Sequence, residues 1–346
     1  MSRVLVTGGS GFIGSHIAEA LLACGHEVVI LDLVAGDAPA DAELVRGDVR
    51  DAEAVAGVLA GVDAVSHQAA KVGLGVDLLD IADYASVNDV GTAVLLRELA
   101  RRRFAGRLVV ASSMVIYGEG RYGCPEHGIV QPPPRAAADL DAGRFEPPCP
   151  RCGAALAPSP VPEDAPADPR NVYAATKLHQ EHLATAFGRE TGVPVTALRY
   201  HNVYGPRMPR DTPYAGVAAL FADAFASRRA PRVFEDGGQL RDFVHVRDIA
   251  RANALALTRE APATGAFNVA SGTPRTIAEL AGALHRAVAP DGPPPLVTGE
   301  YRLGDVRHVF ASPQRAADVL GFGAAEDFAD GIAEFARANA AMDAAA

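Results

Sequence analysis

The sequence has no tryptophan, only four cysteines and no long apolar run. A membrane span needs roughly 20 consecutive apolar residues, so we expect no membrane contact. The longest basic run is Arg101–Arg103, and with a net charge of -10 this composition does not predict a nucleic-acid partner. Residues 3–6 already form an expected strand, which leaves no room for a secretion signal. A cytoplasmic protein without disulfides is therefore expected.

What the chain does have is a regular alternation of strand and helix patterns. Its 346 residues, 49% of them hydrophobic, suffice for a large core and for two domains. The expected elements are strand 3–6, helix 15–23, strand 27–31, strand 62–67, helix 88–103 and strand 107–111. This order predicts an α/β protein with a doubly wound parallel sheet of the Rossmann type.

A glycine-rich loop joins the first strand to the first helix. Gly8 permits the tight turn, Gly11 lets the backbone approach a pyrophosphate, and Gly14 lets the helix pack closely. The helix N-terminus then offers free N–H groups to phosphates. Asp32 ends the second strand, where an acid hydrogen-bonds the adenosine ribose and would repel the 2′-phosphate of NADP. The pattern favours NAD, and a simple turn aspartate is the alternative.

Tyr173 and Lys177 lie four residues apart in a predicted helix that Asn171 is suited to cap. Both side chains would then point from one helix face into the same site. A phenol has a pKa near ~10, and a neighbouring cation lowers it. Such a pair can move a proton on and off a substrate hydroxyl. The alternative is an ordinary helix that carries a Tyr and a Lys by chance.

Several motifs along the chain resemble the extended short-chain dehydrogenase/reductase family, in its nucleotide-sugar epimerase/dehydratase branch. They follow the family's order over nearly the whole chain: TGGSGFIG (7–14), GDVRD (47–51), HQAA (67–70), SSMVIYG (112–118), YAATK (173–177), LRYHNVYGP (198–206), QLRDFVHVRD (239–248), FNVASG (267–272) and RLGD (302–305). The resemblance implies an NAD-binding half, residues 1–200 with returning segments at 243–270. It also implies a smaller α/β substrate domain, residues 201–242 and 271–346.

The resemblance also assigns roles to single residues. Tyr173 would be the general base, Lys177 would hold the nicotinamide ribose, and Ser113 would hydrogen-bond the hydroxyl being oxidised. The expected NAD contacts are Gly8, Gly11, Phe12, Ile13, Gly14, Asp32, Leu33, Asp48, Val49, Gln68, Ala69, Ala70, Asn88, Ser112, Tyr173, Lys177, Tyr200 and Val203. The expected substrate contacts are Ser113, Asn202, Arg241, Arg302 and Asp305. For each of the two arginines, a solvated surface charge is the alternative.

The residues after Ser113 narrow the reaction. Relatives that eliminate water carry an Asp-Glu pair there, whereas this chain has Met114 and Val115, which cannot transfer a proton. The groups that remain are the hydroxyl of Ser113, the phenol of Tyr173, the ammonium of Lys177 and a bound NAD. Together they can remove a hydride from a sugar carbon and put it back, which predicts a 4-epimerase that regenerates NAD in each cycle. A net NAD-dependent dehydrogenase or ketoreductase is the enzymatic alternative. A non-catalytic NAD sensor would tolerate the loss of Tyr173 or Lys177, and both are present.

Between Ser113 and Tyr173 the chain carries a proline-rich insertion, residues 119–170, with 12 of the 25 prolines and no clear periodicity. It is expected to be mostly loop. Within it, Cys124-x2-His127 and Cys149-x2-Cys152 have the spacing of two zinc half-sites. Four protein ligands leave no open position, so the predicted zinc is structural. A disulfide or a chance pattern is the alternative.

The stretch SSMVIYGEGRYGCPEH, with CPRCG after it, is also similar to dTDP-L-rhamnose 4-epimerases. The expected substrate is therefore dTDP-L-rhamnose, interconverting with dTDP-6-deoxy-L-talose, and UDP-glucose or UDP-glucuronate is the alternative. Family members commonly dimerise through the helix after Asn88 and the helix that carries Tyr173, so a homodimer is expected.

Overall fold

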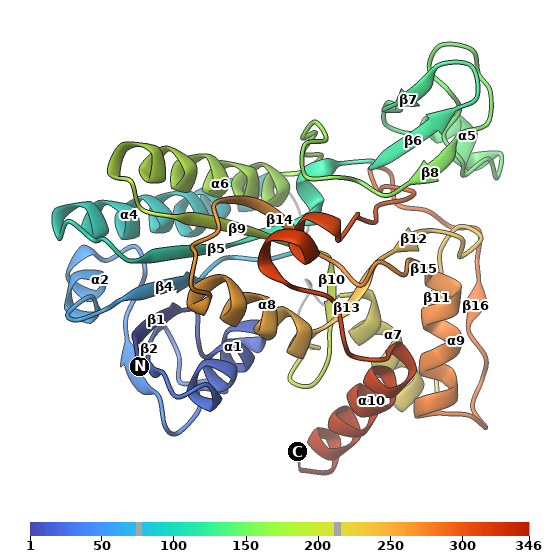
Figure 1. Ribbon diagram of the computed structural model, residues 1–346. Coiled ribbons are helices and arrows are strands. Elements are labelled where there is room, and N and C mark those ends of the chain that lie inside the picture. The colour runs from blue at the N-terminus through green and yellow to red at the C-terminus, as the bar shows by residue number, and fades with distance from the viewer. Residues whose placement is uncertain (74–77, 211–215, 346) are drawn as a thin grey trace.

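The computed structural model describes residues 1–73, 78–210 and 216–345. Its centre is a sheet built from β1 (Arg3–Thr7), β2 (Glu27–Asp32), β3 (Glu43–Arg46), β4 (Ala64–His67), β5 (Arg107–Ser113), β9 (Val195–Tyr200) and β14 (Gly265–Val269). The seven strands are parallel and lie in the order β14-β9-β5-β4-β1-β2-β3 (Figure 1). The predicted doubly wound α/β sheet is confirmed.

Helices cover both faces of this sheet. One face carries α2 (Ala52–Val58), α4 (Gly91–Arg101) and α6 (Val172–Thr191), and the other carries α1 (Phe12–Ala23) and α8 (Val246–Thr258) (Figure 1). Successive strand residues point to opposite faces, so Leu5 packs with the first group of helices while Val4 and Val6 pack with the second. Because both faces of the inner strands are buried, the residues in the middle of these strands are mostly apolar.

The strand order reverses between β1 and β4, and in open α/β sheets ligands bind at such a point, beyond the carboxyl ends of the strands. The glycine loop follows β1 there, and β5 ends at Ser113. At the start of α6 the Asn171 side chain accepts a hydrogen bond from Ala174 N at 2.8 Å, which confirms the predicted N-cap. The helix expected over 88–103 begins earlier, with η1 (Leu78–Asp80), α3 (Ile81–Tyr84) and a π-helical turn, η2 (Ala85–Val90).

A smaller α/β unit lies over these strand ends. Its helices α7 (Val217–Ala226), α9 (Ile277–Val288) and α10 (Phe328–Ala345) pack around Phe225 and Phe335. Its strands pair as β10 (Asn202–Tyr204) with β13 (Phe243–His245), β11 (Arg232–Val233) with β16 (Leu296–Val297), and β12 (Leu240–Arg241) with β15 (Arg275–Thr276). A π-helical turn, η4 (Ala316–Leu320), leads into α10.

The insertion forms a lobe beyond this unit, at the upper right of Figure 1. After a 3-10 turn, η3 (Met114–Tyr117), it contains β6 (Arg121–Cys124), β7 (Gly128–Val130), α5 (Ala137–Asp141) and β8 (Ala157–Ser159), with the strands antiparallel in the order β7-β6-β8. The expectation of mostly loop is confirmed, because these elements are short and most residues of the insertion lie outside them. Strands of three or four residues are also too short to show a period in the sequence.

A narrow neck closes the insertion at its base. Asp168 N donates a hydrogen bond to Ile116 O at 2.8 Å. Gly118 has a positive φ of 62°, and a Cβ at this position would run into Asp168 O. The two stems of the insertion therefore touch each other next to Ser113, where the chain leaves the central sheet.

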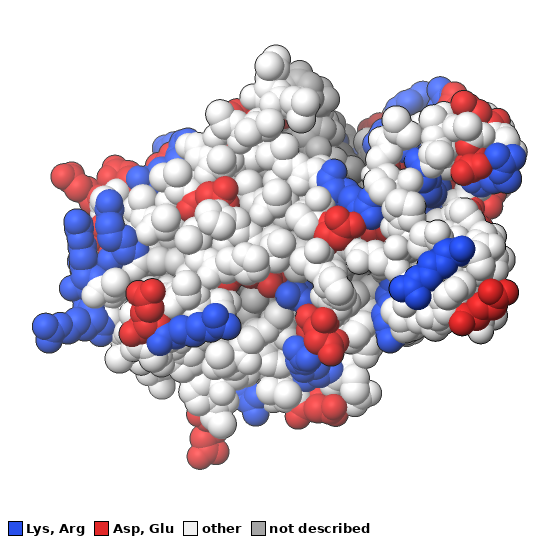
Figure 2. Space-filling view, turned by 90° about the horizontal axis from the view of Figure 1, so that it is seen from above, with Lys and Arg blue, Asp and Glu red and all other residues white. Residues whose placement is uncertain are grey.

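Within the described ranges, no helix is both long and apolar enough to cross a membrane. On the face shown in Figure 2, basic side chains lie among acidic ones, and the middle of the face is largely uncharged. On this side, charged residues of both signs therefore lie around a largely uncharged centre.

Candidate active site

A cavity of about 1010 Å³ opens at the carboxyl ends of the strands, under the smaller unit. Ligand pockets commonly measure about 300–1,000 Å³, so this one has room for an extended ligand. The predicted site residues that line it are Gly8, Gly11, Phe12, Ile13, Gly14, Asp32, Leu33, Asp48, Val49, Gln68, Ala69, Ala70, Ser112, Ser113, Tyr173, Lys177, Tyr200, Asn202, Val203, Arg241, Arg302 and Asp305. The fold thus brings all but one of the predicted cofactor and substrate residues to one space.

The glycine loop has little room for side chains. Gly8 has a φ of 69°, and a Cβ there would lie 2.7 Å from Ala69 N. A Cβ on Gly14 would run into Gly8 O. Asp32 fixes the loop from the end of β2, because its Oδ2 accepts a hydrogen bond from Ser10 N at 3.0 Å. The loop is therefore held in shape by its neighbours and presents bare backbone to the cavity.

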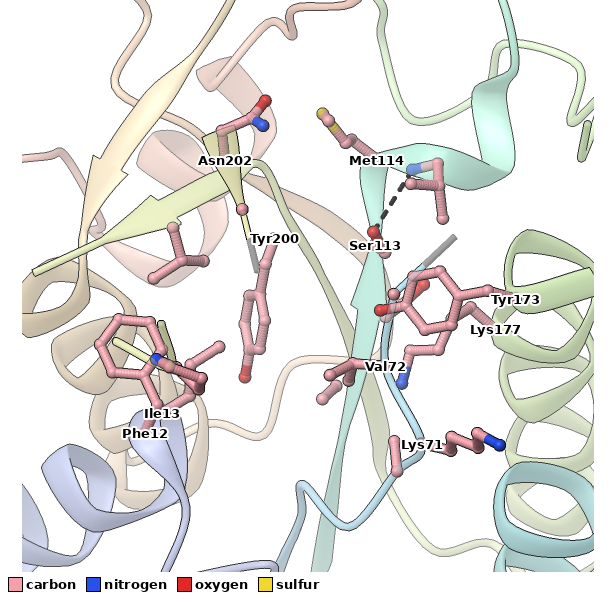
Figure 3. A pocket seen from close by; sticks show the side chains of 18 of the residues that line it. Phe12, Ile13, Lys71, Val72, Ser113, Met114, Tyr173, Lys177, Tyr200 and Asn202 are labelled. Carbon is pink, nitrogen blue, oxygen red and sulfur yellow. Dashed lines mark hydrogen bonds between the residues drawn. The ribbon is translucent and has the colours of Figure 1, made fainter. Parts of the chain in front are cut away.

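Ser113, Tyr173 and Lys177 face one another across a small part of this cavity (Figure 3). Ser113 stands at the end of β5, and its Oγ accepts a hydrogen bond from Val115 N at 3.3 Å. Burial raises the pKa of Tyr173 to about 12, although a hydrogen bond with Ser113 acts in the opposite direction. The resting site therefore holds Tyr173 as a neutral phenol.

The expected lowering of the Tyr173 pKa by Lys177 does not hold in this structure. The Lys177 ammonium donates to Gln180 Oε1 at 2.8 Å instead of turning to the phenol. Burial also lowers the pKa of Lys177 itself to about 8, against the charge of Glu181, which raises it. Burial thus affects the pKa values of both groups more than the interaction between them does. The sequence showed only that the two residues are four positions apart, and it could not show their burial.

Sequence reasoning missed a buried chain of hydrogen bonds behind Lys177. Gln180 Nε2 donates to Thr92 Oγ1 at 2.7 Å, and Thr92 donates its own proton to Asn88 O at 2.6 Å. His67 Nε2, 2.9 Å from Thr92 Oγ1, must therefore be a donor, and Nδ1 accepts from Thr7 at 2.7 Å. Burial lowers the pKa of His67 to about 3. A neutral imidazole of defined tautomer thus anchors the chain that orients Lys177.

Two of the predicted NAD contacts, Asn88 and Ser112, form side-chain hydrogen bonds with other residues of the protein. Asn88 does not line the cavity. Its amide donates to Lys71 O at 3.0 Å and to Thr176 Oγ1 at 2.9 Å, so that it supports the cavity wall from behind. Ser112 does line the cavity, and its hydroxyl donates to Glu181. Neither role can be read from a motif, because each depends on a partner far away in the sequence.

On the opposite side, the predicted substrate residues surround the space beneath the smaller unit. Arg241 donates through Nη1 to Leu240 O and Arg307 O and through Nη2 to Val306 O, at 2.7–2.9 Å. Its Nε–H and one Nη2–H lie outside these bonds, since a guanidinium has five donors. Asn202 Oδ1 is buried and has no hydrogen-bond partner among the residues that the structure describes. Arg241 and Asn202 thus retain polar atoms that can bind a ligand.

Near Ser113 the cavity wall is apolar. Val72, Met114 and Val115 all line it, and Figure 3 places Val72 and Met114 on either side of Ser113. Arg170, which sequence reasoning also missed, lines the cavity from the neck of the insertion and pairs with Asp168 at 2.6 Å. Its position just before the helix that carries Tyr173 could have identified Arg170 as a candidate site residue from the sequence.

The four predicted metal ligands form one cluster in the insertion. Their ligand atoms all lie within 4.8 Å of one another. Cys124 Sγ lies 3.5 Å from His127 Nδ1 and 3.7 Å from Cys152 Sγ, and Cys149 Sγ lies 3.7 Å from His127 Nδ1. Burial alone would raise the pKa of Cys149, but hydrogen bonds from backbone N–H groups and neighbouring thiols lower it to about 6. The cysteines are free thiols.

Comparison with known proteins places the chain in a family. The model of the NAD dependent epimerase/dehydratase family matches residues 4–137 and 153–270, with a gap inside the insertion. The chain is 34% identical to dTDP-L-rhamnose 4-epimerase from Burkholderia thailandensis, over 92% of this chain and 90% of that one. It is 33% identical to UDP-glucose 4-epimerase from Mycolicibacterium smegmatis, over 96% of both.

Solved structures agree with these relatives. Thermus thermophilus UDP-glucose 4-epimerase, solved in complex with NAD, matches with a TM-score of 0.76 and 32% identity, over 97% of this chain and 98% of that one. These matches confirm the enzyme class expected from the motifs, and the chain belongs to the NAD dependent epimerase/dehydratase family.

Proposed function

We propose that this protein is a nucleotide-sugar 4-epimerase, and that its substrate pair is dTDP-L-rhamnose and dTDP-6-deoxy-L-talose. The observation that carries the proposal is the meeting of Ser113, Tyr173 and Lys177 in the cavity that Arg241 also lines. At one end of this cavity Tyr173 can transfer a proton, and at the other end Arg241 can bind a diphosphate. Met114 stands where a dehydratase needs an acid.

NAD fits the part of the cavity formed by the glycine loop and Asp32. Positions 8 and 14 reject a side chain, so the bare backbone and the start of α1 can receive a pyrophosphate. When bound, NAD accepts a hydride from the sugar and returns it. The Asp32 carboxylate would repel the 2′-phosphate of NADP, so the nucleotide released from purified protein is expected to be NAD. Recovery of NADP instead would contradict this assignment.

The chain's own residues handle the proton. In the forward direction Tyr173 takes the proton from the sugar 4-hydroxyl while Ser113 holds the oxygen by a hydrogen bond. Removal of the C4 hydride then leaves a keto group, and after the sugar has turned, the hydride returns to the opposite face and Tyr173 returns the proton. Accepting the first proton requires the phenolate, which Lys177 favours when its ammonium turns from Gln180 towards the phenol.

The apolar wall beside Ser113 supports a 6-deoxysugar. Val72, Met114 and Val115 offer methyl and thioether surface, which suits a C6 methyl group better than a hydroxymethyl or carboxylate group. The resemblance to dTDP-L-rhamnose 4-epimerase points in the same direction. UDP-glucose 4-epimerases are also similar over nearly the whole chain, and UDP-sugar epimerisation is therefore the second candidate.

The deciding experiment is incubation with dTDP-L-rhamnose, without added reductant, followed by NMR of the sugar. The talo epimer should appear with no net NADH. Turnover of UDP-glucose or UDP-glucuronate in its place would support 4-epimerisation and contradict the proposed substrate. A stable 4-keto product with stoichiometric NADH would contradict epimerisation and indicate a net NAD-dependent dehydrogenase.

We also propose that Cys124, His127, Cys149 and Cys152 bind one structural zinc ion. Zn–S bonds of about 2.3 Å in a tetrahedron put the sulfurs about 3.8 Å apart. The observed separation of 3.7 Å between Cys124 and Cys152 supports this ligand set. Elemental analysis should find one zinc per chain in the wild type and none after Cys149→Ser. A metal-free protein with an ordered insertion would refute the ligand set.

The assembly and domain boundaries are part of the same proposal. We expect a two-fold homodimer through the outer surfaces of α4 and α6, because isologous interfaces close with two copies. Light scattering that reports a monomer would contradict it. Residues 1–200 with 243–270 would form the NAD half, and 201–242 with 271–346 the substrate half. We also expect the enzyme to be cytoplasmic, where cysteines are kept reduced.

A further inference from the structure

The insertion does more than project from the fold, because its residues hold one wall of the cavity. This wall consists of residues 234–241 and 302–309, and we call it the substrate wall. Arg135, from the insertion, is buried with 4% of its side chain exposed. It donates to Glu235 Oε1 at 2.7 Å and to Asp305 O at 2.8 Å. Since both partners line the cavity, Arg135 ties the insertion directly to its surface.

A second link starts next to the metal cluster. Tyr122 lies on β6, two residues before Cys124, and its hydroxyl donates to Glu119 Oε1 at 2.9 Å. The same hydroxyl accepts from His308 N at 3.2 Å, while Glu119 accepts from Arg307 N at 2.5 Å. The backbone of the substrate wall is therefore bonded to the strand that carries the first cysteine.

A third link reaches the arginine expected to bind the diphosphate. Glu146 accepts from Arg307 Nε at 2.8 Å and pairs with His308 Nε2 at 2.9 Å. On the other side of this segment, Arg307 O accepts from Arg241 Nη1 at 2.9 Å, and Val306 O accepts from Arg241 Nη2 at 2.7 Å. Residues 306–308 thus lie between the insertion and Arg241, and the carbonyl groups of Val306 and Arg307 orient its guanidinium.

The insertion has little apolar core with which to keep these contacts in place. Its buried apolar cluster consists of Tyr122, Cys124, Val130, Cys149 and Leu156, and two of these five residues are metal-ligand candidates. A segment that buries so few side chains depends on other restraints for its order. The Cys3His cluster brings β6 and the 149–152 turn together, and a bound metal would supply such a restraint.

We propose that metal binding by the insertion sets the affinity of the cavity for the nucleoside diphosphate part of the substrate, with Arg135 and Tyr122 as positioning residues. The metal orders β6, Tyr122 and Arg135 hold residues 305–308, and those residues orient Arg241. The glycine loop, Asp32 and Tyr173 lie outside this chain of contacts. The inference rests on the proposed function, because it takes a nucleotide sugar as the ligand.

The test is calorimetric titration of the zinc-loaded, full-length protein with dTDP and with UDP. Arg135→Ala should weaken binding of the preferred nucleotide at least about tenfold, and Arg135→Lys should restore part of the loss, because a lysine can reach one of the two acceptors. Arg144→Ala is the matched control: Arg144 belongs to the same insertion but pairs with Asp139 at the surface. Its binding constant should equal that of the wild type.

Metal removal provides an independent arm. A chelator should weaken dTDP or UDP binding as Arg135→Ala does, and added zinc should restore it, while the content of bound NAD stays unchanged. In steady-state assays Arg135→Ala should raise KM and leave kcat within about threefold, since Ser113, Tyr173 and Lys177 are untouched. If Arg135→Ala does not fold, Tyr122→Phe removes only the hydroxyl link and should also raise KM.

The outcomes separate the inference from the proposed function. If the wild type binds dTDP or UDP and the folded, zinc-containing variants bind it equally well, the positioning role is wrong while the epimerase proposal stands. If kcat falls with no change in KM or binding, the positioning role is also wrong. If the wild type binds neither nucleotide, the proposed function fails, and the inference fails with it.

Discussion

The central sheet and the insertion are held together by different means. The two faces of the sheet bury 25 and 17 apolar side chains in continuous clusters, whereas the cluster inside the insertion contains five. The sheet therefore has the large apolar burial that drives folding. The insertion depends on ion pairs, on hydrogen bonds to the smaller unit and, in our proposal, on a metal.

This difference separates two tasks within one cavity. The part that we propose transfers the proton lies on the central sheet, where Ser113 ends β5 and Tyr173 lies in the first turn of α6, above a large apolar core. The substrate wall, which we propose binds the nucleotide sugar, is supported by polar contacts from an insertion with little apolar core. Changes in the sheet should therefore affect chemistry or global stability, and changes in the insertion should affect local order and substrate binding.

The largest effect is expected from Tyr173→Phe, which removes the hydroxyl that we propose transfers the proton, without changing the packing of the ring. Turnover should fall by about 10²–10⁴-fold, the usual contribution of general acid–base catalysis. Bound NAD and the unfolding transition should match those of the wild type. Retention of more than a few per cent of the wild-type rate would move the proton-transfer role to another residue.

The next effect concerns the buried ion pair of the sheet. Arg199 donates two hydrogen bonds to Glu181, at 2.9 Å each, with 10% and 6% of the two side chains exposed. Arg199→Leu would leave Glu181 charged and unpaired, and removing one partner of such a pair costs about 3–5 kcal/mol of folding free energy. Urea unfolding measures this. The exposed pair Arg144 and Asp139 provides the contrast, since Arg144→Ala should change stability by less than about 1 kcal/mol.

A smaller effect concerns acid stability. Burial lowers the pKa of His67 from 6.5 to about 3, so the unfolded state takes up the proton first as the pH falls. The stability due to neutral His67 is full above pH 6.5 and is lost as the pH falls towards 3. His67→Gln keeps a donor and an acceptor but does not titrate.

The measurement is urea unfolding of both proteins at pH 7 and pH 5. The wild type should lose roughly 2 kcal/mol more than His67→Gln between the two values. Because both proteins carry the same insertion, the response of the insertion to acid cancels in this comparison. An exposed histidine on α6, His182, provides the control substitution to Gln. Equal losses in wild type and His67→Gln would show that His67 is not buried as a neutral group.

The smallest effect on the sheet is expected from Cys152→Ser. Cys152 is exposed, so the serine disturbs little packing and acts mainly by removing a proposed metal ligand. Backbone amides in β6, β7 and β8 should exchange faster with solvent, while the main unfolding transition shifts by less than about 1 kcal/mol. A large shift of the main transition would mean that insertion and sheet unfold as one unit.

Much of the sheet could be predicted because its signals are local. The strand around Val4 is continuously apolar, the glycines follow it at once, and Asn171 precedes the α6 helix that it caps. Residues such as Tyr173 and Lys177 were found because a helix brings residues four apart together. The spacing of the cysteines likewise placed four metal-ligand candidates that the fold does bring together.

The rest could not be predicted because it depends on contacts between distant parts of the chain. Gln180, Thr92 and His67 meet only when α6, α4 and β4 pack together. The pKa of Tyr173 depends on burial, which no residue spacing reveals. The contacts of Arg135 with Glu235 and Asp305 join positions at least 100 residues apart.

The neck between Ile116 and Asp168 bears on how the length of the insertion affects stability. Because a hydrogen bond joins the two stems at the base, the chain between them forms a loop whose ends lie next to each other. The entropy of closing such a loop grows only with the logarithm of its length, so that doubling it costs about 0.6 kcal/mol. Shortening or lengthening the lobe beyond the neck should thus leave the geometry between Ser113 and Tyr173 intact. The fold can therefore tolerate a different accessory segment at this point, and with it a different support for the substrate.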